Sequence, residues 1–572
     1  MQKILNRKNH TNVFGGILVA TTLFLGCVGS QLGKNNGNEF RNGMVVTANP
    51  IASEVGVEIL KKGGNAVDAA VAVEFALAVV YPNAGNIGGG GFMVYRSAKG
   101  EANTLDFREK AASGASRNMY LDAQGNPIVE KSLYGQLAAG VPGSVAGMVA
   151  AHQKYGKLKW EDLVAPALKL AENGFKITAR QARELNGMKA TFVKLNPLGT
   201  ALVKNEKWAE GDLLIQTELA NTFKLIQTLG LKGFYEGEVA EAIVAEMKRG
   251  GGIITKADLK AYQAIWRKPI TGQYRGYDIV TMPPPSSGGI ALVQLLKSVA
   301  PYPLAKWGFN SDSTVQVIVE AERRVYADRA AHLGDADFYP VPQKQLTDDA
   351  YIKQRMSTFN WQKASLSSEI DAGQIAPAEH EETTHFSIVD REGNAVAITT
   401  TLNGSYGAAV VVKGAGFLLN NEMDDFSVKP GAPNMYGLVG GEANAIAPHK
   451  RMLSSMTPAI LSKNGDLFMV VGTPGGSTII TSVFQTILNV VDFNQSMQAA
   501  VTSKRFHHQW LPDQIDIEEK AIDSLALEKL KSKGYKINPR GPIGRVDAIL
   551  KTKWGYYQGG ADPRGDDKAI GW

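Results

Sequence analysis

The sequence predicts a layered α/β fold in which helices flank stacked sheets. Segments with helical periodicity dominate the chain before residue 330, whereas β-rich segments concentrate near residues 385–401 and toward the carboxyl end. The composition, 44% hydrophobic and 20% charged, is typical of a globular protein. The 572 residues would make about four domain equivalents, or two large pieces that pack intimately.

The helices can be placed from the spacing of apolar residues. A helix over 51–62 stops at Gly63 and Gly64, and a nearly all-apolar helix over 66–80 should be fully buried. Residues 282–289 predict a rigid turn that leads into another helix, and residues 472–477 lead into a helix that ends at Val491. Further helices are predicted over 143–155, 160–173, 216–228, 237–249 and 312–331.

Strands are predicted over 92–96, 102–107, 416–421, 458–461 and 467–471. The glycine run over 85–91 lies between a helix and a strand, the reverse of the order in a dinucleotide-binding fingerprint, so it indicates close backbone packing. Residues 429–448 lack periodicity and are rich in Gly, Pro and Asn. We expect them to form a mobile surface loop that could act as a lid.

A β-hairpin carries the most distinctive chemistry. Residues 385–389 and 395–401 are β-rich, and 390–394 have the composition of a turn. Antiparallel partners keep a constant index sum, so a turn centred near 392 places Thr383 opposite Thr401 at the open end, with Asn403 just beyond. Residues 363–382 are polar and aperiodic, which predicts an exposed, mobile lead-in.

Cleavage between Glu382 and Thr383 would place a free α-amine beside the Thr383 hydroxyl. That amine could then act as the general base for a hydroxyl nucleophile. The alternative is an ordinary half-buried hairpin whose threonines reflect β-propensity. The hairpin alone leaves both interpretations open. Gly475 and Gly476 precede a predicted helix, so their N–H groups form a candidate anion or oxyanion site.

The first 27 residues are typical of an export signal. A basic start precedes an apolar run from Val13 to Leu25 that is too short to span a bilayer comfortably. The run ends in a lipoprotein-like box at Cys27, although Phe24 is unusual at its position; the alternative is ordinary cleavage beside an incidental cysteine. Cys27 is the only cysteine, which excludes a disulfide framework. Residues 28–40 would follow as a flexible tether.

The net charge also limits the class of partner. Of the formal +6, Lys3, Arg7 and Lys8 lie in the leader, and their removal leaves +3. That charge is too weak to indicate binding to nucleic acid or to a membrane surface.

Seven segments together resemble the γ-glutamyltranspeptidases, N-terminal nucleophile hydrolases that are made as one precursor. They are TTHFSIVD, TLNGSYG, LLNNEMDDFS, MLSSMTP, GTPGGS, DFREKA and NIGGGGFMVY, and the resemblance covers residues 40–572. It implies an αββα sandwich of mostly antiparallel sheets, without metal or cofactor. It also implies self-cleavage into a heterodimer of a large subunit (41–382) and a small catalytic subunit (383–572).

The same resemblance assigns roles to individual residues. Thr383 would be the nucleophile, Thr401 would hydrogen-bond to it, and Gly475 and Gly476 would form the oxyanion hole. The substrate's α-carboxylate would bind Arg108, Ser454 and Ser455. Its α-amino group would bind Asn403, Glu422 and Asp425, although Glu422 stands where members carry either Gln or Glu. Tyr436 would belong to a lid.

These residue types suit a γ-glutamyl group, which carries a zwitterion at one end and an amide at the other. An arginine offers a bidentate fork to the carboxylate, and acids or amides suit the ammonium. These assignments have plainer alternatives: Arg108 as a surface pair with Glu109 or another acid, Asp425 as a solvated loop acid or helix cap, and Ser454 and Ser455 as turn residues.

The leading hypothesis is γ-glutamyl transfer from glutathione and related amides to water, amino acids or dipeptides. One alternative is a related acylase acting on glutaryl-β-lactams or other amides. Glutaryl lacks the α-amino group that Asp425 and Glu422 would bind. A second alternative is a non-catalytic, lipid-anchored binding protein with the same fold. In each case we expect an exported, periplasmic protein that the Cys27 lipid attaches to the outer membrane.

Overall fold

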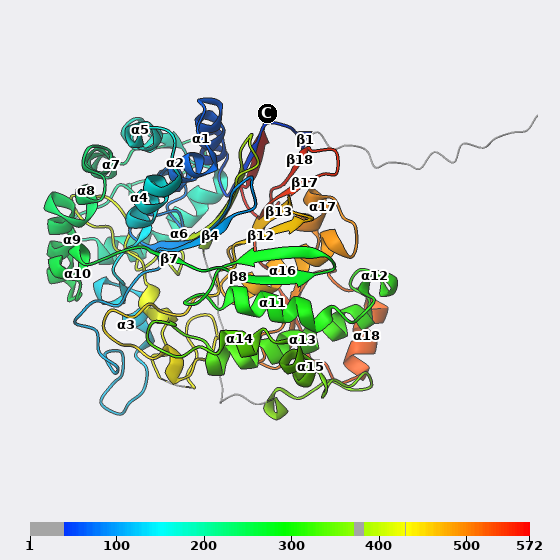
Figure 1. Cartoon of the computed structure of the whole chain (residues 1–572). Helices are drawn as coiled ribbons and strands as arrows, with labels where there is room; N and C mark the ends of the chain where they lie inside the picture. The colour runs from blue at the N-terminus through cyan, green and yellow to red at the C-terminus, as the bar shows by residue number, and fades with distance from the viewer. Residues whose placement is uncertain (1–38, 371–382, 430) are drawn as a thin grey trace, which may run out of the picture. The chain divides into compact units, whose positions relative to one another are not determined.

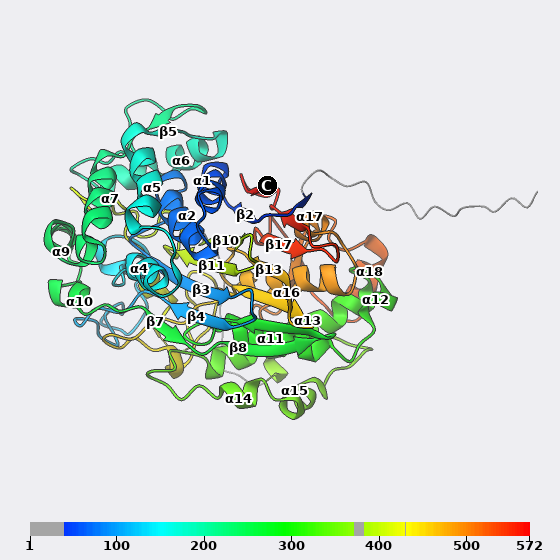
Figure 2. The same cartoon turned by 45° about the horizontal axis from the view of Figure 1, so that its top comes forward.

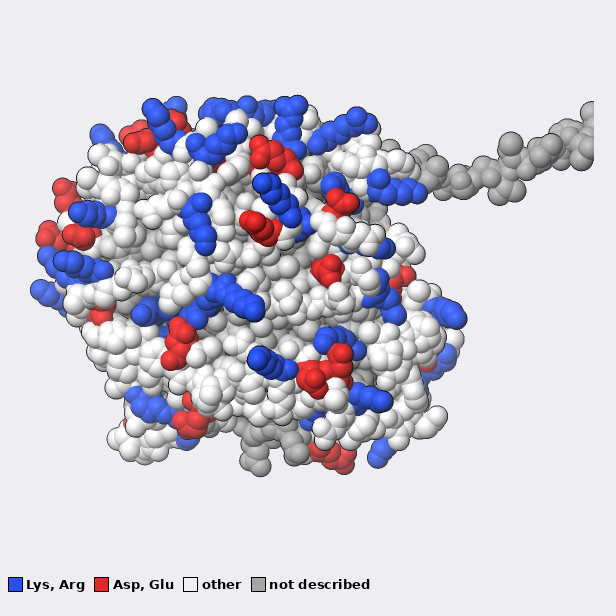
Figure 3. Space-filling view, viewed as in Figure 1, with Lys and Arg blue, Asp and Glu red and all other residues white. Residues whose placement is uncertain are grey.

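The computed structural model describes residues 39–370, 383–429 and 431–572. The predicted signal segment, Cys27, almost all of the tether and residues 371–382 of the lead-in, including Glu382, lie outside this described part. Two seven-stranded sheets form the centre of the described part (Figure 1). On the face shown in Figure 3, basic and acidic side chains are interspersed, in keeping with the modest net charge.

The first sheet holds the predicted hairpin at its middle. Its strand order is β19-β2-β10-β11-β3-β4-β7, and all neighbours are antiparallel. Thr383 pairs with Thr401 across β10 and β11, which confirms the predicted register. The strands are β2 (Met44–Thr47), β3 (Gly90–Arg96), β4 (Ala102–Asp106), β7 (Ile265–Arg267), β10 (Thr383–Val389), β11 (Ala395–Thr401) and β19 (Lys568–Gly571).

The second sheet is also antiparallel throughout, in the order β1-β18-β17-β13-β12-β9-β8. Apolar side chains from the two sheets, among them Val46, Val94, Val470 and Ile549, form one buried cluster. The strands are β1 (Glu39–Phe40), β8 (Ile270–Tyr274), β9 (Tyr277–Thr281), β12 (Ala459–Lys463), β13 (Asp466–Gly472), β17 (Asp547–Lys551) and β18 (Tyr557–Gly560). The sheets therefore stack face to face.

Helices cover the two outer faces (Figures 1 and 2). The first sheet packs against α1 (Pro50–Lys61), α2 (Ala66–Val80) and α4 (Ser144–Tyr155), and α5 (Trp160–Asn173) packs on α2. α6 (Ala179–Leu195), α7 (Thr217–Leu229) and α9 (Gly237–Gly250) lie beyond them. The second sheet packs against α11 (Gly288–Val299), α16 (Thr478–Val491) and α17 (Met497–Thr502), and α13 (Asp312–His332) packs on α11. The predicted layered α/β class is confirmed as αββα, and no described helix is both long and apolar enough to cross a membrane.

The predicted helices agree with the structure to within a residue or two, and α2 is buried along its whole length. Asn65 explains its clear start, because its side chain accepts hydrogen bonds from the N–H groups of Val67 and Asp68 in a capping box. The glycine run is also in close backbone contact, as predicted. A Cβ on Gly88 would lie 2.0 Å from the carbonyl oxygen of Leu418, and one on Gly89 would lie 2.0 Å from that of Thr401.

Two predictions of local structure need correction. Residues 416–421 form no strand and contribute one isolated bridge, Val411 to Leu418, because the segment bonds to loop backbone such as Gly88 rather than to a strand. The start of the lead-in is not exposed throughout. Ser367 and Ile370 are buried, and Ser367 accepts a hydrogen bond from the buried Arg323.

Candidate active site

The threonine pair ends the central hairpin at a small buried cavity. Thr383 and Thr401 are 4% and 2% exposed. The Thr401 hydroxyl accepts a hydrogen bond of 2.7 Å from the N–H of Asn403. Asn403 has a φ of 74°, a left-handed conformation that Asn tolerates better than most residues, and it turns the chain back toward the cavity. The side chains of Thr383, Thr401 and Asn403 all line this cavity.

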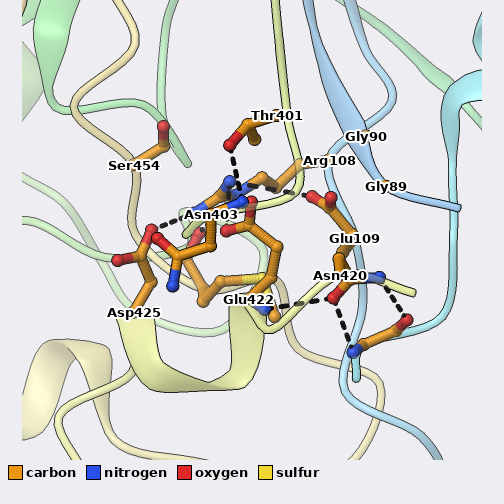
Figure 4. A network of polar contacts seen from close by, with 12 residues as sticks. Gly89, Gly90, Arg108, Glu109, Thr401, Asn403, Asn420, Glu422, Asp425 and Ser454 are labelled. Atoms are coloured by element: carbon orange, nitrogen blue, oxygen red, sulfur yellow. Dashed lines mark hydrogen bonds and ion pairs between the residues drawn. The ribbon is translucent and has the colours of Figure 1, made fainter. Parts of the chain in front are cut away.

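The strand β4 and the carboxyl group of Asp106 position Arg108. The N–H of Arg108 donates to Asp106 Oδ1 at 2.9 Å just after the strand ends. The guanidinium is buried and reaches three carboxyl groups, as Figure 4 shows: Glu422 at 2.6 Å, Glu109 at 3.6 Å and Asp425 in the closest contact. The plain alternative of a surface pair is therefore wrong for Arg108, although Glu109 is one of its partners.

Three buried acids around one arginine cannot all carry full charge at little cost. Burial raises the pKa of Glu109 to about 8 and the pKa of Glu422 well above its ordinary value, in each case against the opposing pull of Arg108. Burial also raises the pKa of Asp425, again opposed by Arg108. For Arg108, burial opposes the charge, but the attraction of the acids prevails and raises its pKa. The cluster therefore holds its arginine charged and shares protons among its acids.

The loop over 429–448 packs onto this cluster. The Tyr436 hydroxyl donates to Asn403 Oδ1, and Asn434 donates to Asp425 Oδ1 at 3.0 Å. Tyr436 is only 6% exposed, and a short 3₁₀ turn, Glu442–Asn444, lies within the loop. The expectation of a surface loop is therefore wrong for its central part, because polar side chains bond it to the site. Tyr436 and Leu438 of this loop line the cavity, and the role of a lid stays a prediction.

Ser454 and Ser455 line the same cavity as Thr383. Ser455 Oγ accepts a hydrogen bond of 3.0 Å from Arg329, which also donates to Ser287 Oγ at 2.9 Å. The carbonyl oxygen of Ser454 in turn accepts from the N–H of Ser287 at 2.8 Å. Arg329 also lines the cavity, and it is not among the residues predicted from the sequence. It is one of several charged residues on α13, and nothing in its local pattern separates it from the others.

Gly475 and Gly476 lie just before α16, with φ values of 133° and 43° that favour glycine. Their carbonyl oxygens accept hydrogen bonds from Thr478 and Ile479, which start the helix. Within the described part of the chain, neither glycine N–H donates to a protein acceptor. Gly476 lines the cavity together with Thr383. This geometry suits the predicted oxyanion site.

The structure thus brings together nearly all of the predicted site residues that it describes. One cavity is lined by Arg108, Thr383, Thr401, Asn403, Asp425, Tyr436, Ser454, Ser455 and Gly476, and also by Arg329, Leu438, Met456 and Ile479. Glu422 joins through Arg108, and Gly475 adjoins Gly476. In the ranges that the structure describes, no group of three or more His, Cys, Asp or Glu side chains is placed to hold a metal ion.

A second buried acid, Glu74, lies behind β10 and β11 on the side of the helices. Glu74 of α2 accepts a hydrogen bond of 2.9 Å from the hydroxyl of Thr400. Asn86 donates to the same hydroxyl at 3.1 Å and to the carbonyl oxygen of Thr401 at 2.9 Å. Burial raises the pKa of Glu74 to about 8, partly offset by the Thr400 hydrogen bond. A neutral carboxyl thus supports β11 from the helix side.

Comparison with known proteins places this site in a family. The family model described as Gamma-glutamyltranspeptidase matches residues 52–572. The chain belongs to the γ-glutamyltranspeptidase family. It is 47% identical over 535 residues to the glutathione hydrolase proenzyme of Escherichia coli (strain K12), an alignment that covers 93% of this chain and 92% of that protein.

Two solved structures support the assignment of the family and the fold. The γ-glutamyltranspeptidase of Helicobacter pylori is 48% identical, with a TM-score of 0.57, and covers 60% of this chain and 97% of its own. The cephalosporin acylase from Bacillus halodurans is 26% identical, with a TM-score of 0.83, over 94% of this chain and 97% of its own. The chain is therefore an enzyme of this family with the αββα fold of the N-terminal nucleophile hydrolases.

We predict that replacing Glu74 with Gln removes a pH-dependent loss of stability. An unfolded glutamate ionises above about 4.5, whereas folded Glu74 keeps its proton up to about 8. Between these values the folded state binds more protons, so its free energy of unfolding falls as the pH rises. In denaturant unfolding from about pH 5 to 8, the free energy of unfolding of Glu74→Gln should rise relative to that of the wild type as the pH increases. Glu58→Gln, on the exposed face of α1, is the control. A stability difference that does not change with pH would contradict this prediction.

Proposed function

We propose that this enzyme transfers the γ-glutamyl group of glutathione and related amides to water or to acceptor amino acids and dipeptides. The observation that carries the proposal is the convergence of Arg108 and Asp425 on the cavity that Thr383 lines. A cation and an anion side by side suit the carboxylate and ammonium of one glutamyl α-carbon. The Escherichia coli relative, named a glutathione hydrolase proenzyme, supports the same substrate class.

The chemistry requires a free α-amine on Thr383. That amine removes the proton of the Thr383 hydroxyl, whose oxygen attacks the γ-carbonyl carbon. The N–H groups of Gly475 and Gly476 stabilise the oxyanion that forms on the carbonyl oxygen. The intermediate then collapses, and the leaving amine takes up the proton. Water or an acceptor amine next attacks the threonyl ester and releases the glutamyl product together with free Thr383. Thr401 orients the nucleophile as its cross-strand partner.

Binding of the substrate would exchange partners within the charged cluster. The α-carboxylate binds Arg108 with Ser454 and Ser455, and the ammonium binds Asp425 with Asn403 and Glu422. The ion pair between Arg108 and Asp425 is then replaced by two pairs to the substrate, so neither buried charge is left alone. Arg329 supports this wall through Ser455, and Tyr436 closes over it.

Maturation would cut the chain between Glu382 and Thr383 and leave subunits of 41–382 and 383–572. Strands from both pieces interleave in the central sheet, where β10 lies between β2 and β11, and β11 lies between β10 and β3. The cut pieces therefore remain paired by sheet hydrogen bonds and together form the site. The enzyme is exported to the periplasm, where a lipid on Cys27 holds it to the outer membrane.

The alternative of a glutaryl acylase draws support from the fold of the Bacillus halodurans cephalosporin acylase. Glutaryl has no ammonium, so when its carboxylate binds Arg108 it would offer Asp425 and Glu422 no second cation in exchange. The acids around Arg108 favour a γ-glutamyl substrate. A non-catalytic binding protein is disfavoured by the threonine pair, which lies beside two glycine N–H groups that have no acceptor among the described residues.

The first prediction from this mechanism concerns self-cleavage. The wild-type chain should yield two pieces, the second beginning at Thr383, because the threonine hydroxyl attacks its own preceding peptide bond. Thr383→Ala should remain one chain, since its methyl group cannot attack, whereas Thr384→Ala should still be cut. Denaturing electrophoresis and the amino-terminal sequence of the smaller piece report the outcome. Cleavage of purified Thr383→Ala at the same bond would show that Thr383 is not responsible.

The second prediction separates the two charges of the substrate. Asp425→Ala should lose about 2–5 kcal/mol of transition-state stabilisation toward a γ-glutamyl anilide, because the ammonium is left unpaired. That corresponds to roughly thirty- to several-thousand-fold in kcat/KM. The kcat/KM of Asp425→Ala toward glutaryl anilide should stay close to that of the wild type, because this substrate has no ammonium. Arg108→Ala should weaken both substrates, since both present a carboxylate.

Glu442→Ala is the control, because this acid lies in the neighbouring loop over 429–448 with its side chain 73% exposed. It should leave both activities near those of the wild type. Normal cleavage of the γ-glutamyl anilide by Asp425→Ala would rule out the assignment of the ammonium to Asp425 and remove the main support for the substrate class.

The third prediction concerns attachment. One acyl chain gives only marginal binding to a membrane, so stable anchoring through Cys27 requires several. Cys27→Ser should therefore move the enzyme from the membrane fraction to the soluble fraction after cell breakage, with its specific activity unchanged. Mass analysis of the wild-type amino-terminal peptide should show the acyl groups. An unchanged distribution together with an unmodified peptide would exclude the anchor.

A further inference from the structure

His385 lies two residues beyond Thr383 on the same face of β10, between the two sheets. It is completely buried, and the mechanism above does not use it. Burial lowers its pKa to about 3, so the imidazole is neutral near pH 7. A neutral ring of this kind affects the reaction through its position rather than through its charge.

The ring is held by hydrogen bonds on both nitrogens. His385 Nδ1 lies 2.9 Å from Thr399 Oγ1, and Nε2 lies 3.1 Å from Ser387 Oγ. The Ser387 hydroxyl donates its own proton to the carbonyl oxygen of Asp547 at 3.1 Å. Ser387 must therefore accept from the ring, which places the imidazole proton on Nε2 and leaves Nδ1 to accept from Thr399. The orientation of the ring is thus determined by Thr399 on one side and by the second sheet on the other.

The ring packs against Gly472, the last residue of β13 in the second sheet. A Cβ at position 472 would lie 2.3 Å from Cε1 and 2.4 Å from Nδ1 of His385, closer than side chains approach one another. Gly472 does not have a positive φ, so its backbone conformation does not require glycine. The side chain is absent because the imidazole occupies its place.

This contact joins the two halves of the proposed reaction centre. On β10, Thr383 lies two residues before His385. After β13 of the second sheet, Gly475 lies three residues beyond Gly472, with Thr473 and Pro474 between them. The thickness of the ring therefore sets how closely the strand bearing the nucleophile approaches the loop bearing the N–H donors. The hydrogen bonds to Thr399 and Ser387 keep the ring from rotating out of this gap.

We propose that His385 is a positioning residue that sets the distance between Thr383 and the Gly475–Gly476 loop through its contact with Gly472. This inference rests on the proposed roles of Thr383 and the two glycines. The substrate clamp lies on other segments: Arg108 follows β4, and Asp425 lies in the 3₁₀ turn Glu422–Asp425. A change in the gap should therefore lower kcat and leave KM almost unchanged.

The gentler test removes one hydrogen bond and leaves the packing. Thr399→Val keeps the shape of the side chain but frees Nδ1, whereas Thr399→Ser keeps the hydroxyl. We expect the Val variant to lose roughly three- to tenfold in kcat, as for the loss of one hydrogen bond, with KM unchanged. The Ser variant should restore most of this loss. Wild-type kcat in both variants, or an equal loss in both, would overturn the inference.

The stronger test is a double-mutant cycle. Gly472→Ala forces the ring and the loop apart, and a misplacement of about 1 Å can cost on the order of 100-fold in rate. In the His385→Ala background the methyl group at 472 has room, so the same substitution should cost less than about threefold. Additive losses would overturn the proposal. If Gly472→Ala fails to fold or mature, the pair of Thr399 variants decides the matter alone.

Failure of this inference is separate from failure of the proposed function. Thr383→Ala should remain uncleaved and inactive whether or not His385 sets the gap. If Thr383→Ala retains activity, the proposed function is wrong. If Thr383→Ala is inactive while the cycle is additive, only the positioning role of His385 is lost. The ratio of activities on γ-glutamyl and glutaryl anilide should stay at its wild-type value in every His385, Gly472 and Thr399 variant.

Discussion

The buried guanidinium of Arg108 is the interaction on which the site depends. A charge of this kind is costly to remove from water, and it is held here by Glu109, Glu422 and Asp425. The acids and the arginine come from two distant stretches of chain, residues 108–109 and 422–425. Because an arginine without partners would be strongly destabilising, the fold has to bring these stretches together. The same arrangement leaves a cation and an anion where a zwitterion can exchange with them.

The second constraint is the antiparallel register of β10 and β11, which sets Thr383 against Thr401. Side chains on both faces of this hairpin hold it in place. On the helix side, Glu74 and Asn86 bond to Thr400, and the glycines before β3 let neighbouring backbone approach closely. On the inner side, His385 packs against Gly472. Thr383, the proposed nucleophile, is thus at the end of a strand held on both faces, as suits a group that must be placed accurately.

Much of this could be predicted from the sequence. Apolar periodicity located the long helices, and the constant index sum of a hairpin located the threonine pair. These signals are local, and local signals are strong for regular elements. The prediction of a strand over 416–421 was wrong because the backbone of this segment bonds to loops. The periodicity of a sequence does not show which backbone a segment will pair with. The prediction that the loop around Tyr436 lies at the surface was wrong for a similar reason. Its polar side chains form hydrogen bonds to residues of the site rather than to water, and its composition does not distinguish the two.

Other site residues depend on contacts that only the fold creates. Arg329 lies among other charged residues on one helix, and His385 lies within a run that any strand could contain. The roles proposed for both depend on contacts with residues distant in the chain, Ser455 and Gly472, so neither has a recognisable pattern in its own segment. The resemblance to a family supplied the roles of Arg108 and Asp425. The structure adds Glu109 to the buried partners of Arg108, whereas the sequence indicated Glu109 only as a surface partner.

The central claim is that Thr383 carries the glutamyl group during the reaction. It is tested most directly by rapid acid quenching of the mature enzyme during turnover of a γ-glutamyl anilide, followed by mass analysis of its proteolytic peptides. The account predicts that the peptide beginning at Thr383 gains the mass of one glutamyl group, and that this adduct disappears when an acceptor amine is supplied in excess. An adduct on any other residue, or turnover by a chain in which Thr383 still follows Glu382, would contradict it.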